Sequence, residues 1–154
     1  MRVSVIVSAL ALVFASVVVC LADNPLIGTW KLNEAKSKLA PGATKNTTVV
    51  YEAAGDNVKI TVDGVDGSGS PTHNEWTGKF DGKDYPVTGD PTSDMRSYKQ
   101  IDERTLEFTA SKGGKATLTG RIVVSADGKS RTVTTTATDA KGVKVSSTAV
   151  YDKQ

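Results

Sequence analysis

Apolar and polar side chains alternate with a period of two along most of the chain after residue 22. Val58, Ile60 and Val62, for example, are separated by Lys59 and Thr61. The same alternation recurs over residues 106–110, 116–124 and 143–151. Because successive side chains of a β-strand point to opposite faces, this pattern predicts strands with one buried face and one exposed face.

Turn-forming residues interrupt the alternation about every ten to twelve residues. Most of these breaks contain glycine beside an aspartate or another glycine, the composition that tight hairpins prefer. We therefore predict antiparallel strands over residues 27–33, 47–54, 57–65, 73–80, 95–101, 104–111, 115–125, 130–138 and 143–151. A short additional pairing is predicted at Tyr85–Thr88. Irregular loops are predicted over Glu34–Asn46, with one helical turn at Asn33–Leu39, and over Asp81–Asp94.

The composition of residues 23–154 favours sheet over helix. This part of the chain contains 19 Thr and 12 Val, and such β-branched side chains suit a pleated, half-buried surface. Eight to ten consecutive antiparallel strands can close into a barrel, which leaves no exposed sheet edge. The predicted fold class is therefore all-β, a single antiparallel up-and-down β-barrel of about 8–10 strands, with a β-sandwich as the alternative.

The first 22 residues differ from the rest of the chain. Arg2 precedes a run from Val3 to Ala22 that contains no charged residue. A basic start, an apolar stretch and small residues near a possible cleavage site are typical of a secretory signal peptide. We predict that residues 1–22 are removed near Ala22, which leaves a secreted or periplasmic domain of residues 23–154. A retained membrane anchor and lipidation at Cys20 are the alternatives, and each of them also places the domain outside the cytosol.

Without the signal peptide the chain has no cysteine, because Cys20 is the only one. The domain must therefore be stabilised by burial alone, without disulfides. Removing Arg2 leaves 18 basic against 17 acidic residues. A net charge this close to zero argues against a nucleic-acid partner and against membrane contact beyond the signal segment. We expect one domain and a monomer.

Several segments of the domain resemble a known type of protein. The first predicted strand contains the motif Gly28-Thr29-Trp30, which resembles the first motif of the lipocalin (calycin) superfamily. The segments NEAKSK at 33–38, DGKDYPVTGDP at 81–91 and DGKS at 127–130 are similar to those of uncharacterised secreted bacterial lipocalin-like proteins. The resemblance implies a β-barrel in which Trp30 is a structural plug at one end. It implies no established activity.

No group of residues in the sequence predicts catalysis. Gly128-Lys129-Ser130 resembles the end of a phosphate-binding loop, but Val123 stands where that motif requires glycine, so a hairpin turn is favoured. His73 is the only histidine, and with Glu75 it provides two ligands where a zinc site uses three or four. We therefore predict no catalytic residue, no metal site, no cofactor and no enzymatic activity.

Aromatic side chains on the inward faces of the predicted strands favour a ligand-binding role. They either fill the core or line a cavity in which a few polar groups orient an apolar ligand. We predict that a small, partly apolar or amphiphilic ligand contacts five residues, Trp76, Tyr51, Phe108, Tyr98 and Arg96.

The alternative function is a structural or interaction module with a solid barrel core. Its outer surface, rich in threonine along Thr132–Thr138, would contact a protein or envelope partner. The interior volume distinguishes the two hypotheses, because a ligand carrier needs a cavity and a solid module does not.

Overall fold

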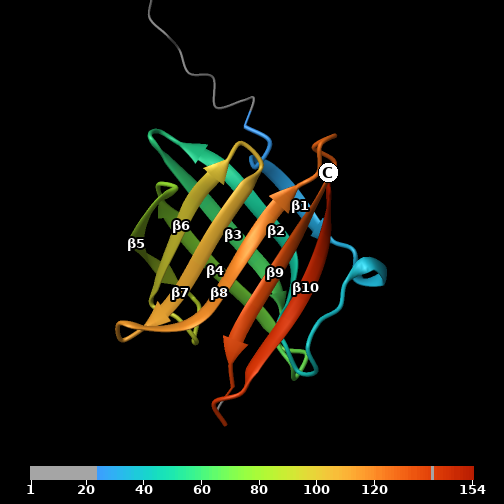
Figure 1. Cartoon of the computed structure of the whole chain (residues 1–154), viewed down its shortest axis with the longest axis vertical. Coiled ribbons are helices and arrows are strands. Elements are labelled where there is room, and N and C mark those ends of the chain that lie inside the picture. Colours follow the sequence, from blue (N-terminus) through green and yellow to red (C-terminus); the bar gives the residue numbers. More distant parts are fainter. Residues whose placement is uncertain (1–23, 140) are drawn as a thin grey trace, which may run out of the picture.

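The computed structural model describes residues 24–139 and 141–154 (Figure 1). The predicted signal peptide, residues 1–22, with its cleavage site near Ala22 and with Cys20, lies outside the described residues. Within the described part of the chain, no helix has the length and apolar character needed to cross a membrane.

Ten antiparallel strands form a closed barrel, with a single short 3-10 helix among the described residues. The elements are β1 (Gly28–Leu32), η2 (Glu34–Lys36), β2 (Lys45–Ala54), β3 (Asn57–Val65), β4 (Pro71–Gly78), β5 (Asp81–Thr88), β6 (Met95–Asp102), β7 (Thr105–Lys112), β8 (Lys115–Val124), β9 (Ser130–Thr138) and β10 (Lys144–Lys153). Each strand pairs with the next in sequence, and β10 pairs with β1 to close the sheet (Figure 1). The prediction of a single up-and-down barrel is confirmed, and the β-sandwich is excluded.

The expectation of an irregular loop over Asp81–Asp94 is wrong for its first half, which forms β5. Pro86 suggested a loop because proline has no N–H to donate to a sheet. Val87 donates its N–H to the carbonyl of Asp94, on the β6 side. Successive N–H groups of a strand point to opposite sides, so the position of Pro86 faces β4. The pairing of β4 with β5 is confined to residues 75–76 and 87–88, so the missing donor of Pro86 costs no ladder bond.

The predicted helical turn after the first strand is confirmed in position but is shorter than expected. It is η2, whose start is capped by Asn33, with the side-chain oxygen accepting the N–H of Lys36. The chain then runs beside β10, where Lys38 forms a bridge with Thr148. The N–H of Ala40 donates to a side-chain oxygen of β10 at 2.9 Å. These contacts hold the segment Leu39–Thr44 at the end of the barrel where β10 begins.

A β-bulge in β2 turns an extra polar side chain into the barrel. The pairing of β2 with β3 shifts register between Asn46 and Thr48. Asn46 and Val49 consequently both face the interior, although residues three apart face opposite sides of a regular strand. The bulge needs Gly64 on the neighbouring strand, because a Cβ there would collide with the carbonyl oxygen of Lys45.

A second bulge has the same effect in β8. Ala110 pairs with Leu118 and Ser111 pairs with Ala116, which leaves Thr117 as the extra residue. Thr117 and Leu118 both line the interior in spite of being adjacent. The two bulges therefore add polar groups to an interior that simple alternation would have kept apolar.

Trp30 lies in the core at the end of the barrel where β9 begins and β10 ends. Its side chain is 0% exposed, and its indole N–H donates to the carbonyl of Leu26 at 3.1 Å. Trp30 pairs with Val49 on β2 and with Lys153 on β10, so it stands at the seam that closes the sheet. A residue at this position stabilises both the core and the closure.

Replacing Trp30 with alanine should lower the free energy of unfolding by about 4 kcal/mol, because the substitution leaves a large cavity in the core. Lys31→Ala is the matched control. Lys31 is the next residue of β1 and is exposed, so its replacement should change stability by less than about 0.5 kcal/mol. Urea unfolding followed by circular dichroism measures both effects. Equal stability of the two variants would contradict a core role for Trp30.

Candidate ligand-binding cavity

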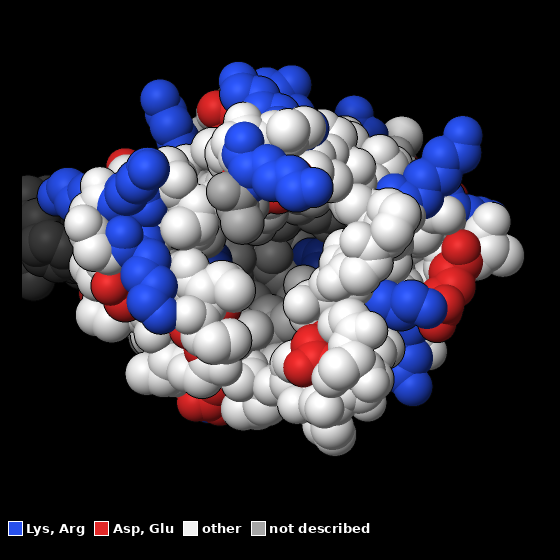
Figure 2. All heavy atoms as spheres, turned by 90° about the horizontal axis from the view of Figure 1, so that it is seen from below, with Lys and Arg blue, Asp and Glu red and all other residues white. Residues whose placement is uncertain are grey.

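The barrel encloses a cavity of about 730 Å³ that opens at one end. The opening lies where β9 ends and β10 begins, and the lining there comes from Leu39–Thr44, Gly89–Thr92 and Thr138–Asp139. Figure 2 looks into this hollow from below and shows Lys or Arg atoms inside it. The interior is thus accessible from solvent and is not filled by side chains.

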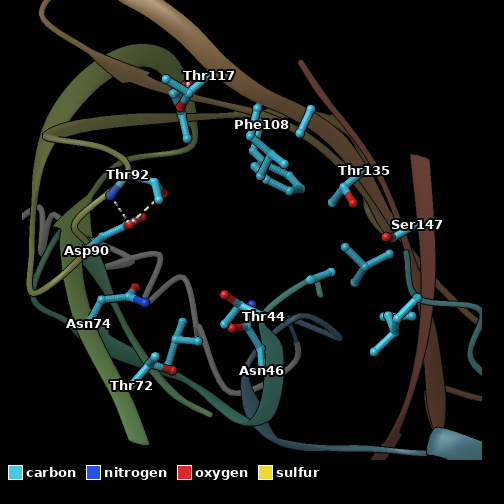
Figure 3. A pocket seen from close by; sticks show the side chains of 18 of the residues that line it. Thr44, Asn46, Thr72, Asn74, Asp90, Thr92, Phe108, Thr117, Thr135 and Ser147 are labelled. Carbon is cyan, nitrogen blue, oxygen red and sulfur yellow. Dashed lines mark hydrogen bonds between the residues drawn. The ribbon is translucent and has the colours of Figure 1, made fainter. Parts of the chain in front are cut away.

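A layer of polar side chains surrounds the outer part of the cavity. Figure 3 shows that these side chains come from opposite walls and point into the same space. We call them the polar layer: Thr44, Asn46, Thr72, Asn74, Thr117, Thr135 and Ser147. Their hydroxyl and amide groups can donate or accept hydrogen bonds, so they suit a ligand with uncharged polar groups near the opening.

An apolar layer lies below the polar layer. The next lining residue below Thr135 on β9 is Val133, and the next below Ser147 on β10 is Ala149. Val133 pairs with Ala149, and it also pairs with Ile122 on β8. Other apolar residues that line the cavity are Leu32, Val49, Val62 and Leu118. This layer can bury the hydrocarbon part of a ligand.

The floor of the cavity, one step deeper along the same strands, consists of Arg131, Tyr51 and Tyr151. Arg131 pairs with Tyr151 across β9 and β10, and all three residues line the cavity. The guanidinium carbon of Arg131 lies 4.8 Å from the centre of the Trp30 ring, 4.8 Å from that of Tyr51 and 4.9 Å from that of Tyr151. Cation–π contacts with these rings hold the guanidinium in place.

A second arginine in the lining, Arg96, has a carboxylate partner. Its Nη2 atom lies 3.0 Å from Oδ2 of Asp90, and its Nη1 atom donates to the side-chain oxygen of Asn74 at 3.3 Å. The other oxygen of Asp90 accepts the N–H and the hydroxyl of Thr92 (Figure 3). The side chains of Arg96 and Asp90 are only 10% and 14% exposed. This buried pair fixes the segment Gly89–Thr92 at the cavity opening.

The hydrogen bonds of Asp90 affect its acidity. Burial raises the pKa of the carboxyl, but hydrogen bonds from Ser93 and Thr92 and the charge of Arg96 lower it further than burial raises it. The pKa of Asp90 therefore lies below its ordinary value, and the carboxylate is ionised at neutral pH. The charge of Arg96 is compensated within the protein.

The structure brings four of the five predicted ligand contacts to the cavity wall: Tyr51, Phe108, Tyr98 and Arg96. Trp76 is not part of the lining. It is 1% exposed and lies behind the wall, where its indole N–H donates to the carbonyl of Arg96 at 2.8 Å. Whether the four lining residues contact a ligand stays a prediction.

Trp76 instead supports the wall from behind. Its ring centre is 4.8 Å from that of Tyr98 and 6.3 Å from that of Phe80. Tyr98 in turn stacks on Phe108 at 5.6 Å. The Phe108 ring covers Gly120 on β8, where a Cβ would collide with it. These four residues, Trp76, Phe80, Tyr98 and Phe108, form an aromatic cluster. The cluster holds the cavity-facing rings of Tyr98 and Phe108 in fixed positions, and Trp76 affects the cavity only through these two rings.

Sequence reasoning missed Arg131, Asp90 and the polar layer. Arg131 occupies an inward position of β9, in register with Val133 and Thr135, but a charged residue in an alternating strand is ordinarily assigned to the exposed face. Two members of the polar layer depend on bulges, which alternation does not reveal. The signal that was available for Arg131 is its place in the period-two series of β9.

The histidine lies on the outer surface of the barrel. His73 is half exposed, with Nδ1 at 2.6 Å from an oxygen of Asp63 and Nε2 at 3.8 Å from one of Glu75. Glu75 also pairs with Lys59 at 2.9 Å. No group of three or more potential metal ligands occurs among the described residues. His73 lies between the lining residues Thr72 and Asn74 of β4 but on the opposite face of the strand, so the cluster is not part of the cavity lining.

Comparisons with known proteins identify no family. No family model matches the chain, and no curated protein matches it. Similar solved structures include EF1p2_mFAP2b bound to DFHBI, with 11% identity, covering 84% of this chain and 94% of that chain at a TM-score of 0.47. A redesigned β-barrel, mFAP1 bound to DFHBI, has 14% identity, covering 84% of this chain and 95% of that chain at a TM-score of 0.44. Lobster apocrustacyanin A1 has 13% identity, covering 86% of this chain and 62% of that chain at a TM-score of 0.44. At such identities and TM-scores, none of them bears on what this chain binds.

Replacing Asp90 with asparagine should lower the free energy of unfolding at pH 7 by about 3 kcal/mol, because it leaves the buried charge of Arg96 without a carboxylate partner. Glu107→Gln is the matched control. Glu107 pairs with Arg121 at 2.8 Å, but the two side chains are 48% and 52% exposed, so its loss should cost less than about 1 kcal/mol.

The same comparison has a predicted pH dependence. Because the pKa of Asp90 is lower in the folded protein than in the unfolded chain, its contribution to stability is complete above the unfolded value of about 4 and disappears as the pH falls through the folded value. Urea unfolding should therefore show a difference between wild type and Asp90→Asn that shrinks on acidification. A difference that is absent at pH 7 or constant with pH would contradict the role of this pair.

Proposed function

We propose that this chain is an exported, non-enzymatic barrel that binds a small, partly apolar molecule in its interior. The observation that carries the proposal is the open cavity of about 730 Å³ with an apolar layer between polar groups. Small-molecule sites are concave, mostly apolar and oriented by a few polar groups, with volumes of about 300–1,000 Å³. The cavity has each of these properties.

The energy of binding would come from burial of the ligand. A ligand that buries about 200 Å² of apolar surface gains about 5 kcal/mol from the hydrophobic effect. Association costs part of this gain. A preformed cavity held by the aromatic cluster and the Asp90–Arg96 pair reduces the cost, because few side chains need to be ordered on binding.

The alternative function, a structural or interaction module with a solid core, is less well supported. Its premise was an interior filled by side chains, and the interior contains a cavity. The threonine-rich strand β9 does expose Thr132 and Thr134 to solvent. Nothing about these residues indicates a particular partner, so we favour the ligand-binding function.

Export is part of this proposal and rests on the sequence of residues 1–22 alone. In this proposal the domain acts in the periplasm or outside the cell after cleavage near Ala22. The monomeric state and the relation to secreted bacterial lipocalin-like proteins also stay predictions. The barrel needs no cofactor for the function proposed.

The purified domain should bind N-phenyl-1-naphthylamine, a neutral apolar dye whose fluorescence rises when it leaves water. Val133→Trp should weaken this binding at least about tenfold, or 1.4 kcal/mol, because the added indole occupies the apolar layer. Thr134→Trp is the matched control, since Thr134 is the next residue of β9 and is exposed. Fluorescence titration measures both variants, and circular dichroism checks that both are folded.

Two results would contradict the proposal. One is an absence of saturable dye binding to the folded wild-type domain. The other is equal loss of binding in Val133→Trp and Thr134→Trp, which would place the dye outside the cavity.

A further inference from the structure

Arg131 is buried with only part of its hydrogen-bonding capacity used. The residue is 2% exposed, and its Nε and Nη1 atoms are buried with no hydrogen-bond partner. A guanidinium has five N–H donors, and leaving buried donors unsatisfied is costly. The guanidinium of Arg131 lies over the rings of Trp30, Tyr51 and Tyr151. The Tyr51 hydroxyl accepts one hydrogen bond from Arg131, which leaves Nε and Nη1 without an acceptor.

No carboxylate compensates the charge of Arg131 among the described residues. The lining contains three carboxylates, of Asp66, Asp90 and Asp139. Asp90 is paired with Arg96, and Asp66 and Asp139 lie at the cavity opening, beyond the polar layer. The Nζ atom of Lys153 lies 5.1 Å from the centre of the Trp30 ring, so a second cation is close to the floor. The floor of the cavity therefore carries excess positive charge.

The tyrosines of the floor do not supply negative charge. Burial raises the pKa of the Tyr51 hydroxyl, and this effect outweighs the lowering effect of Arg131. Burial likewise raises the pKa of Tyr151. Both hydroxyls are therefore neutral at physiological pH. They remain available as hydrogen-bond donors beside the guanidinium.

We propose that Arg131 binds the carboxylate of the ligand at the floor of the cavity, while the apolar body of the ligand occupies the layer above. This inference rests on the proposed function and specifies its ligand as a hydrophobic carboxylic acid. A carboxylate offers two acceptor oxygens in the spacing that a guanidinium fork matches. It would also compensate a buried charge that the protein leaves unpaired.

The strand geometry sets the size of the apolar body. Thr135 of the polar layer lies four residues beyond Arg131 on β9, or about 13 Å along the strand. Strands of a barrel are tilted by about 40°, so the apolar layer is about 10 Å deep. A chain of seven or eight carbons, or an aromatic system of similar length, spans this depth.

The test compares octanoate with octanamide as competitors of the bound dye at pH 7. The two compounds share the same hydrocarbon chain and differ in charge at one end. Octanoate should displace the dye at a concentration at least about tenfold lower than octanamide, because hydrogen bonds to a charged group are stronger than those to a neutral one. Arg131→Met should remove this preference and leave dye binding in place.

Arg121→Met is the matched control, since Arg121 lies on the outer face of β8 and is half exposed. It should keep the full preference for octanoate. Arg131→Lys retains the charge but not the planar fork, and it should keep only part of the preference. The comparison of octanoate with octanamide on the wild-type domain needs no variant, so it holds even if Arg131→Met does not fold.

The outcomes separate this inference from the proposed function. Failure of the wild-type domain to bind the dye overturns the proposed function and the inference with it. Dye binding in which octanoate is no better a competitor than octanamide, or in which neither competes, overturns the carboxylate site alone. A preference for octanoate that persists in folded Arg131→Met also overturns it, and would point to another cation of the lining.

Discussion

The pairing of β1 with β10 closes the sheet, and the rest of the structure depends on this closure. In an open sheet one face can remain exposed, but in a closed barrel every inward side chain must share one interior. The closure therefore decides which residues form a core and which face a cavity. It is also short, three paired residues long, and Trp30 at one end of it is among the most buried side chains of the described residues.

The interior is organised by depth. At the opening, the polar layer comes partly from regular strands and partly from the bulges of β2 and β8. Below it lie aliphatic side chains, and below these the floor around Arg131. Stability comes mainly from the end of the barrel that is filled, where the aromatic cluster and Trp30 pack. The unfilled part forgoes packing energy that a solid core of the same length would have.

The strand pattern could be predicted from the sequence because a period of two is a direct consequence of backbone geometry. It located nine of the ten strands and indicated part of β5, although Pro86 argued against a full strand there. The same pattern led to four residues that line the cavity, three inward aromatic side chains and Arg96. Trp76 obeys the pattern but lies behind the wall. Alternation says which face a residue occupies and not how deep it lies.

Of the two buried arginines of the interior, the sequence indicated Arg96 but not Arg131. Arg96 and Arg131 both lie at inward positions, but only the structure shows that they differ. Arg96 has Asp90 and Asn74 as partners, so its burial is explained by the fold. Arg131 has aromatic rings and the Tyr51 hydroxyl around it, and its Nε and Nη1 atoms have no acceptor among the described residues. A protein that needed only a filled core would be served as well by an apolar residue there. The burial of this charge is best explained by an anionic group that comes from outside the chain.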